Sequence, residues 1–517
     1  MRFCELAKQA WRTLFTYGII YSILSVLLLP KSTKRGINYI EPKERRVVMA
    51  DAKIRINKIS LWNFKNVTHG TIHLNSSNSI VNNKSDIMGI YGQNASGKTA
   101  VIEALAIIKD IISGRKINPR FENVITNGKD ECTIEVEVSM LYDDYELDCT
   151  AIYKCSLSLR NDPNDNNEKP KKIMAVVSES LRARVNMPGE KFIMQDILKT
   201  DENQLSLLPK GKRTLLFGTN EDMSNFLAQQ KILALYGSRS FIFSHQVSKA
   251  ISENKKNSNS NNEISANWPK MVITYLRYYA TLQLFVIDER TGHNLDFHII
   301  QEGNVLKIPL NVDISLPTSI DTFDEAIKVI NDLIPRLNHV LSNITPGLAL
   351  KVEVEKESLD RNDNKYKVEF LSNREGFGTF PFSNESLGIK KMISFIVLLI
   401  EAYNNPSFTL AIDEMDSGIF EYLFGEILDI MGSSGKGQLI FTSHNLRPLE
   451  RLDPRFVCFT TTDPSNRYIQ MNKKATNNLR DMYIRALQLG YDGKDLYNGD
   501  SKHSLAYAFR KMGRHSE

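Results

Sequence analysis

The residues best suited to chemistry form one run, Gly92-Gln93-Asn94-Ala95-Ser96-Gly97-Lys98-Thr99. Its two glycines let the backbone turn sharply, so that successive N–H groups can point at one bound anion. Lys98 can then reach the β- and γ-phosphates of a nucleotide, and the Thr99 hydroxyl can ligate Mg²⁺. The G-x-x-x-x-G-K-[ST] spacing, known as Walker A, therefore predicts a site for ATP and Mg²⁺. A glycine-rich turn that holds no ligand is the alternative.

Two carboxylates follow a second apolar run, Phe408–Ile412. At the end of a buried strand, Asp413 can hold Mg²⁺ through its water shell, and Glu414 can orient or deprotonate an attacking water. This is the Walker B arrangement, and it predicts hydrolysis of ATP to ADP and phosphate. An ordinary strand that happens to leave the sheet through acidic residues is the alternative.

Two further features lie near these acids. The run Gln438–Ser443 is apolar and ends at His444, although a lone histidine at a strand end is more often structural. The segment Ser383–Lys391 precedes an apolar helix and contains Ser386 and Gly388. The free N–H groups at such a helix start can bind an anion, and plain N-capping by a serine is the alternative.

In this order, Walker A, a Ser-x-Gly signature, Walker B and a terminal histidine resemble the ABC-type ATPase heads of the SMC, RecF and OLD group. The segment Ile54–Asn66 also looks like the first strand and the "NF-K" turn of those heads. Within the group, the sequence is most similar to the stand-alone AAA-family ATP-binding proteins of prokaryotic phage-defence and abortive-infection operons. The likeness covers residues 50–150 and 380–460.

The resemblance assigns roles to several residues. It implies that His444 senses the γ-phosphate and acts with Glu414 in catalysis. It implies that Ser386 and Gly388 contact the nucleotide of a partner subunit, and that Asp416 lies in a D-loop that crosses the interface. ATP would then be sandwiched in a head-to-head homodimer with two sites.

The resemblance also implies a biological role. We expect an ATPase that dimerises on ATP and regulates a separately encoded effector in anti-phage defence. The alternative is a DNA-repair or chromosome-maintenance ATPase of the RecF or SMC kind, and binding of DNA or RNA stays open. Transporter subunits are not expected, because the L-S-G-G-Q signature is absent and a large insertion separates the two halves.

Elements that can position these residues are visible around the motifs. Ile87–Tyr91 is a short apolar run of buried-strand type, and apolar residues then recur at helical spacing from Val101 until Ser113-Gly114 supplies a stop. The fold class expected is α/β, a P-loop NTPase with an ABC-ATPase-type mixed sheet, flanking helices and a helical insertion. No heptad run marks a coiled-coil arm.

The expected domains follow from the placement of the motifs. They are an apolar extension, an N-terminal ATPase lobe with Walker A, a mainly helical insertion with strands, a C-terminal lobe with the remaining motifs and a helical tail. Their ranges are 1–48, 49–165, 166–375, 376–465 and 466–517. The tail is too short for the TOPRIM nuclease domain of OLD-type proteins.

Composition limits the class of protein. The chain has 517 residues, 42% of them hydrophobic and 24% charged, which describes a globular protein and excludes a disordered one. A net charge of +5 permits a basic groove without predicting one. The five cysteines include no C-x-x-C pair, which favours a reducing compartment and a cytoplasmic location.

The apolar run Leu14–Leu29 stands apart from this composition. It is short for a membrane span, and an anchor or an export signal are two interpretations. We favour a third, in which Met49 is the natural start and residues 1–48 are a gene-start artefact.

Overall fold

The computed structural model describes residues 52–512 with short gaps. The gaps are 75–79, 143–146, 164, 166, 168–169, 188–189, 202–203, 209, 219–220, 255–262, 289–295, 302–303, 310–313, 318–319, 361–362, 418, 472–477 and 498–501. The extension 1–48, with its apolar run and the expected start at Met49, lies outside the described residues. Within the described residues, no helix is both long and apolar enough to cross a membrane.

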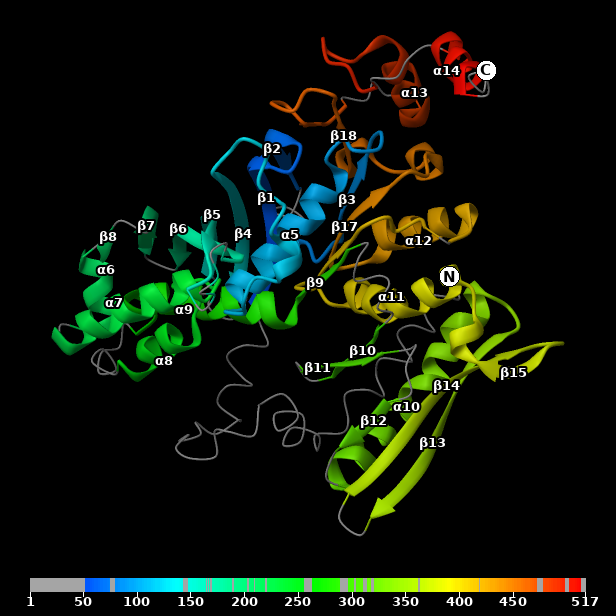
Figure 1. The fold of residues 1–517 in the computed structure, drawn as a ribbon, viewed down its shortest axis with the longest axis horizontal. Coiled ribbons are helices and arrows are strands. Elements are labelled where there is room, and N and C mark those ends of the chain that lie inside the picture. Colours follow the sequence, from blue (N-terminus) through cyan, green and yellow to red (C-terminus); the bar gives the residue numbers. More distant parts are fainter. Residues whose placement is uncertain are drawn as a thin grey trace. The chain divides into compact units, whose positions relative to one another are not determined.

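The chain divides into two units, and the larger holds most of the motifs (Figure 1). One of its two sheets has seven strands in the order β2-β1-β4-β5-β6-β7-β8, all antiparallel. Along β4, alternate residues such as Ile134, Val136 and Val138 are buried, as expected for a sheet with one covered face. The strand bounds are β1 Ala52–Phe64, β2 Val67–His73, β4 Glu131–Tyr142, β5 Leu147–Asn161, β6 Lys172–Met187, β7 Glu190–Asp201 and β8 Gln204–Leu208.

The second sheet of the larger unit positions the predicted site. Its six strands run in the order β19-β18-β3-β17-β16-β9, and all neighbours are parallel except β18 and β19. The bounds are β3 Asp86–Tyr91, β9 Leu284–Ile287, β16 Thr409–Ile412, β17 Gln438–Ser443, β18 Val457–Thr460 and β19 Tyr468–Ile469. Because parallel strands share one carboxyl edge, the segments that follow β3, β17 and β16 meet there.

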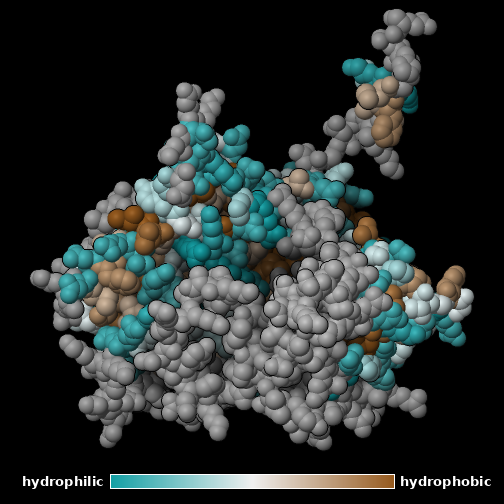
Figure 2. All heavy atoms as spheres, turned by 60° about the horizontal axis from the view of Figure 1, so that its bottom comes forward, coloured by the Kyte–Doolittle hydropathy of each residue, from teal (hydrophilic) through white to brown (hydrophobic). Residues whose placement is uncertain are grey.

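Helix α5 (Lys98–Ile112) packs between the two sheets, against β1 of one and β9, β16 and β17 of the other. Apolar side chains surround the helix, and most of its residues are buried. The larger unit also contains α6 (Lys210–Phe217), α7 (Glu221–Tyr236), α8 (His245–Glu253), α9 (Glu263–Leu282), α13 (Leu479–Leu489), α14 (Lys502–Met512) and most of α12 (Glu421–Ser434). On the face that Figure 2 shows, the coloured hydrophobic residues form separate groups among hydrophilic ones.

A buried arginine joins the amino ends of three parallel strands. Arg55 of β1 has no exposed surface and donates to the carbonyls of Lys84, Pro406 and Lys436. These residues precede β3, β16 and β17 in turn. Burial lowers the pKa of Arg55 to about 10, which still leaves it charged at neutral pH. The residue therefore fixes the first sheet to the second through its hydrogen bonds.

The smaller unit contains the described parts of 289–401 and 417–423. Strands β12 (Ile314–Pro317), β13 (Leu348–Asp360) and β14 (Asp363–Arg374) form a sheet in the order β12-β14-β13, and β15 (Gly378–Pro381) also pairs with β14. A separate hairpin joins β10 (Asp296–Gln301) and β11 (Asn304–Pro309), and helix α10 (Ile320–Ile344) packs on β13. Most of α11 (Leu387–Asn404) completes the unit.

The segment 166–375, expected as a mainly helical insertion with strands, contains both kinds of element, with more strands than that expectation implied. Strands β6, β7 and β8 extend the seven-stranded sheet, β9 joins the six-stranded one, and β10 to β14 follow. The physical reason is visible in β6, where apolar residues alternate with serines and arginines in period two. Helices α6 to α10 do occur in this segment. The aromatic residues Tyr275, Tyr279 and Phe285 of this segment are at most 4% exposed and belong to the core.

Candidate nucleotide-binding site

The predicted phosphate loop connects β3 to α5, as the strand-loop-helix pattern requires. Ala95 and Gly97 have left-handed backbones, with φ of 59° and 95°. Gly97 is also the N-cap residue of α5, so the positive end of that helix faces the loop. A Cβ at Gly92 would lie 1.7 Å from Oγ1 of Thr460, so only glycine fits there.

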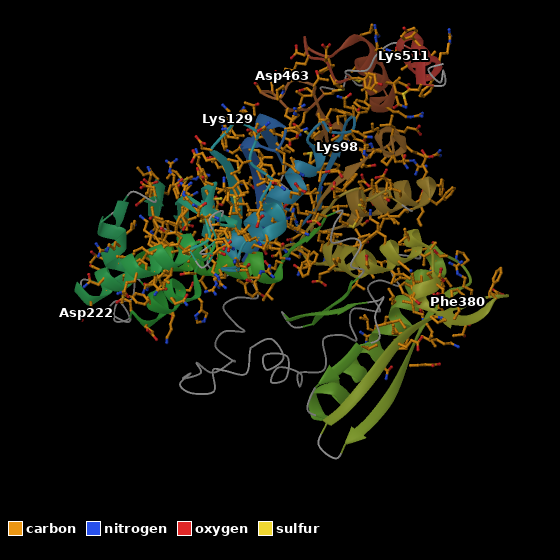
Figure 3. All side chains as sticks on the ribbon, viewed as in Figure 1. Lys98, Lys129, Asp222, Phe380, Asp463 and Lys511 are labelled. Atoms are coloured by element: carbon orange, nitrogen blue, oxygen red, sulfur yellow. The ribbon has the colours of Figure 1, made fainter. Side chains whose placement is uncertain are left out.

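The Lys98 side chain bonds to the backbone of its own loop; Figure 3 labels this residue at the start of α5. Its Nζ donates to the carbonyl oxygens of Gly92 at 2.9 Å and Gln93 at 2.8 Å. Burial lowers the pKa of this amine, and the carboxylates of Asp413, Glu414 and Asp416 oppose the shift. Phosphate oxygens can replace the two carbonyls as acceptors of the Lys98 hydrogen bonds, so the loop fits a nucleoside triphosphate.

The two Walker motifs meet through a direct hydrogen bond. Oγ1 of Thr99 donates to Oδ1 of Asp413 at 3.3 Å, across 314 residues of sequence. The carboxylate is buried at the carboxyl end of β16. A hydroxyl and a carboxylate are both oxygen ligands of the kind Mg²⁺ prefers, so this pair fits the metal expected with ATP.

Thr442, which belongs to no motif in the sequence, forms hydrogen bonds to both Asp413 and Glu414. Its Oγ1 donates to Oδ1 of Asp413 at 2.5 Å and accepts the backbone N–H of Glu414 at 2.8 Å. Glu414 has a left-handed backbone with φ of 47°, which is unfavourable for a residue with a side chain. The threonine can do this because it is the last but one residue of β17, and β17 lies between β3 and β16.

Asp416 of the predicted D-loop contacts the segment of His444, the residue expected to sense the γ-phosphate. Oδ2 of Asp416 accepts the backbone N–H groups of His444 at 3.1 Å and Asn445 at 2.9 Å. The His444 side chain is exposed just beyond β17. Asp416 therefore fixes the segment that carries the histidine, in addition to the interface role that the resemblance implied.

A further acidic residue follows β9, on the other side of β16. Asp288 is 4% exposed and comes one residue after Ile287, whose carbonyl accepts the N–H of Asp413 at 2.8 Å. Arg120 pairs with both oxygens of its carboxylate. The signal was present in the sequence, since the apolar run 284–287 ends in an acid just as 408–412 does.

The predicted signature residues belong to the smaller unit. Ser386 precedes α11, is exposed, and its Oγ accepts the backbone N–H of Ile389 at 3.4 Å. Gly388 lies in the first turn of the helix. The preceding Glu385 is buried and accepts two hydrogen bonds from Arg374 of β14, at 2.9 and 2.8 Å. The helix start is thereby fixed while Ser386 stays accessible.

Three residues from outside the sequence motif hold the phosphate loop from its outer side. Thr460 Oγ1 bonds to the Ser96 hydroxyl, Tyr468 OH donates to the Gly97 carbonyl at 2.8 Å, and Asn66 Nδ2 donates to the Ala95 carbonyl. Sequence reasoning missed them because they lie far from the motif. Only the "NF-K" turn before Asn66 gave a signal.

No protein-family model and no curated protein match this chain. Among solved structures it is similar to the SMC head domain from Thermotoga maritima, at 12% identity and a TM-score of 0.32, over 81% of this chain and 100% of that one. It is similar to a Pyrococcus furiosus Smc head domain bound to the C-terminal domain of ScpA, at 10% identity and a TM-score of 0.36, over 84% and 99%. It is also similar to the recombination mediator protein RecF, at 10% identity and a TM-score of 0.35, over 82% and 100%.

These likenesses are distant and say nothing about what this chain binds. The chain's own topology is specific, however. The buried parallel strand β3 leads through the glycine loop into α5, and β17 lies between β3 and β16, the strand that the acids follow. The predicted fold class is therefore confirmed. The chain has a mixed α/β fold with flanking helices, in which the parallel strand β3 leads through the glycine loop into α5.

Proposed function

We propose that this protein binds ATP with Mg²⁺ and hydrolyses it to ADP and phosphate. The hydrogen bond between Thr99 and Asp413 carries this proposal, because it joins the nucleotide loop to the acidic strand end at the position where a metal would be held. Both groups are supplied by rigid elements, the first turn of α5 and the end of β16.

The chain's own residues account for the steps of the reaction. The loop N–H groups and Lys98 bind the phosphates, and a bound Mg²⁺ would neutralise charge on the leaving group. Glu414 is half-exposed beside the buried Asp413, so its carboxylate can accept a proton from an attacking water. Thr442 holds the Glu414 backbone and thereby orients this general base.

ATP is proposed to join two copies head to head. The exposed Ser386 and the N–H groups at the start of α11 would then contact the γ-phosphate on the partner subunit, since a helix N-terminus favours an anion. His444 and Asp416 would complete the interface from the nucleotide side. Each active site would use residues of both subunits, and the dimer would hold two such sites.

Glu414→Gln tests both steps. The amide is nearly isosteric but cannot accept the proton, so ATP turnover should fall by at least about 100-fold while ATP binding is kept. Sedimentation with and without ATP should then show a dimer only with ATP. Lys98→Ala is the matched control and should lose tight binding and the dimer together.

Two results would contradict these proposals separately. A Glu414→Gln variant that stays monomeric with ATP bound would exclude the composite site and leave ATP binding intact. A Lys98→Ala variant that binds ATP as well as the unchanged protein would exclude the phosphate loop.

The role of this ATPase is proposed to be control of a separately encoded effector in anti-phage defence, which rests on the sequence resemblance. Purification of the protein with its neighbouring gene products, with and without ATP, tests this role. An ATP-dependent complex with a nuclease or toxin would support it. ATP-dependent DNA binding without such a partner would instead support the repair or chromosome-maintenance alternative.

A further inference from the structure

We propose that Arg467 is a positioning residue for the bound nucleotide. It lies in the β18–β19 hairpin (Thr460–Tyr468), about 370 residues from the phosphate loop in sequence. From there it fixes the outer side of the loop and adds a positive charge beside it, so that affinity for ATP depends on it. This inference rests on the ATP binding proposed above.

The geometry places Arg467 directly against the loop. Its Cγ and Cδ lie 3.3 and 3.4 Å from the position of a Cβ built on Gly97, which is the closing glycine of the loop. The side chain is 6% exposed. Figure 3 labels Asp463 in the same hairpin and Lys98 at the start of α5.

The guanidinium holds two backbone segments. Nη1 donates to the carbonyl of Thr461 at 2.7 Å, which closes the hairpin, and Nη2 donates to the carbonyl of Asn66 at 2.5 Å. Asn66 in turn donates through its side chain to the Ala95 carbonyl of the loop. Arg467 therefore acts on the loop through Asn66 as well as by direct contact.

The hairpin is firmly held where Arg467 lies. The carbonyl of Pro464 accepts the N–H groups of Thr68 and His69, at 2.8 and 2.9 Å, so the hairpin is fixed to the start of β2. Tyr468 adds its hydroxyl bond to Gly97, and its ring occupies the space beside Gly70. The arginine is thus presented by a rigid support and its position is defined.

Within the described part of the chain, no ion pair with a carboxylate balances the charge of Arg467. Its guanidinium donates to two neutral backbone carbonyls, and its Nε has no hydrogen-bond partner. Burial lowers the pKa of this guanidinium, with Tyr468 and Asp463 opposing the shift. A buried cation is costly without a counter-charge, and the anion expected in the neighbouring loop would supply one. Nucleotide binding and the placement of Arg467 should therefore stabilise each other.

The test compares Arg467→Gln with Arg455→Gln in the full-length protein. Both changes remove one positive charge, but Arg455 is exposed and paired with Asp453. We expect Arg467→Gln to raise KM for ATP, and the Kd measured by calorimetry, on the order of tenfold, because the phosphate loop loses its outer contact and a positive charge beside it. The kcat should stay within about twofold, since Glu414 and Thr442 are untouched. Arg455→Gln should change neither value.

Several outcomes separate this inference from the proposed function. If the unchanged protein binds no ATP, the proposed function fails. If it binds ATP and Arg467→Gln leaves KM within about twofold, or lowers kcat alone, only the role of Arg467 is refuted.

A second variant covers the case in which Arg467→Gln does not fold. Asn66→Ala truncates an exposed side chain and removes only the link to Ala95. It should raise KM about threefold, as expected for loss of one hydrogen bond. An unchanged KM in Asn66→Ala would equally overturn the proposal.

Discussion

Replacing Thr442 by valine should uncouple the two acidic residues of the site. Valine keeps the shape of threonine but removes the hydroxyl that donates to Asp413 and accepts from Glu414. The buried Asp413 carboxylate then loses a hydrogen bond of the charged kind, with a net contribution of about 1.5–3 kcal/mol. The Glu414 N–H also loses its acceptor, which removes one of the hydrogen bonds that hold this left-handed backbone.

The expected effect is larger on turnover than on binding. A shift of roughly 1 Å in a catalytic group can lower a rate by about 100-fold, so kcat should fall by about that factor. The Kd for ATP should change by less than about threefold, because Thr442 does not touch the phosphate loop. Steady-state ATPase assays and calorimetry with Mg²⁺ and ATP measure the two quantities, and urea unfolding checks that the variant folds.

Thr442→Ser is the matched control, since it retains the hydroxyl and removes only a methyl group. It should keep kcat within about threefold of the unchanged protein. The reasoning is refuted if Thr442→Val retains full turnover, or if the serine variant loses as much as the valine variant.

Two further predictions concern stability. Arg55→Met should lower the free energy of unfolding by about 3–5 kcal/mol, because three backbone carbonyls lose their donor. Urea unfolding measures this change. A loss below about 1 kcal/mol would contradict the role of Arg55 as a link between the sheets. Glu179 of β6 is fully buried and accepts four hydrogen bonds, from Tyr153, Ser240, Phe241 and Ile242, yet burial raises its pKa. The folded state therefore binds the proton more tightly than the unfolded state, so this residue's contribution to stability is present at acidic pH and is lost as pH rises through the raised pKa. Compared with Glu179→Gln, the unchanged protein should lose stability as the pH rises above the ordinary range of a glutamate, and parallel pH profiles of the two proteins would exclude the effect.

Local patterns in the sequence determined the parts of the site that lie on one element each. The glycine spacing at 92–97, the apolar strand before it and the helical periodicity after it are all encoded within 30 residues, so the strand, loop and α5 could be predicted. The acids after β16 were visible for the same reason, because an apolar run that ends in carboxylates is a local signal. The strands of 166–208 carried such a signal too, in the period-two alternation of β6, and they fall in the segment expected as a mainly helical insertion with strands.

The tertiary structure decided which of these elements are neighbours. Strand order is set by packing across the sheet, and no local period in the sequence records that β17 lies between β3 and β16. The position of Thr442 between the two acids follows from that order alone. Arg467 depends on a hairpin that reaches back to β2 and the phosphate loop over several hundred residues, and the loop's own motif contains nothing that anticipates it. Side chains such as Arg467 and Tyr468 donate to backbone carbonyls. Because every residue carries a carbonyl, only the folded structure could show which of them these side chains bind.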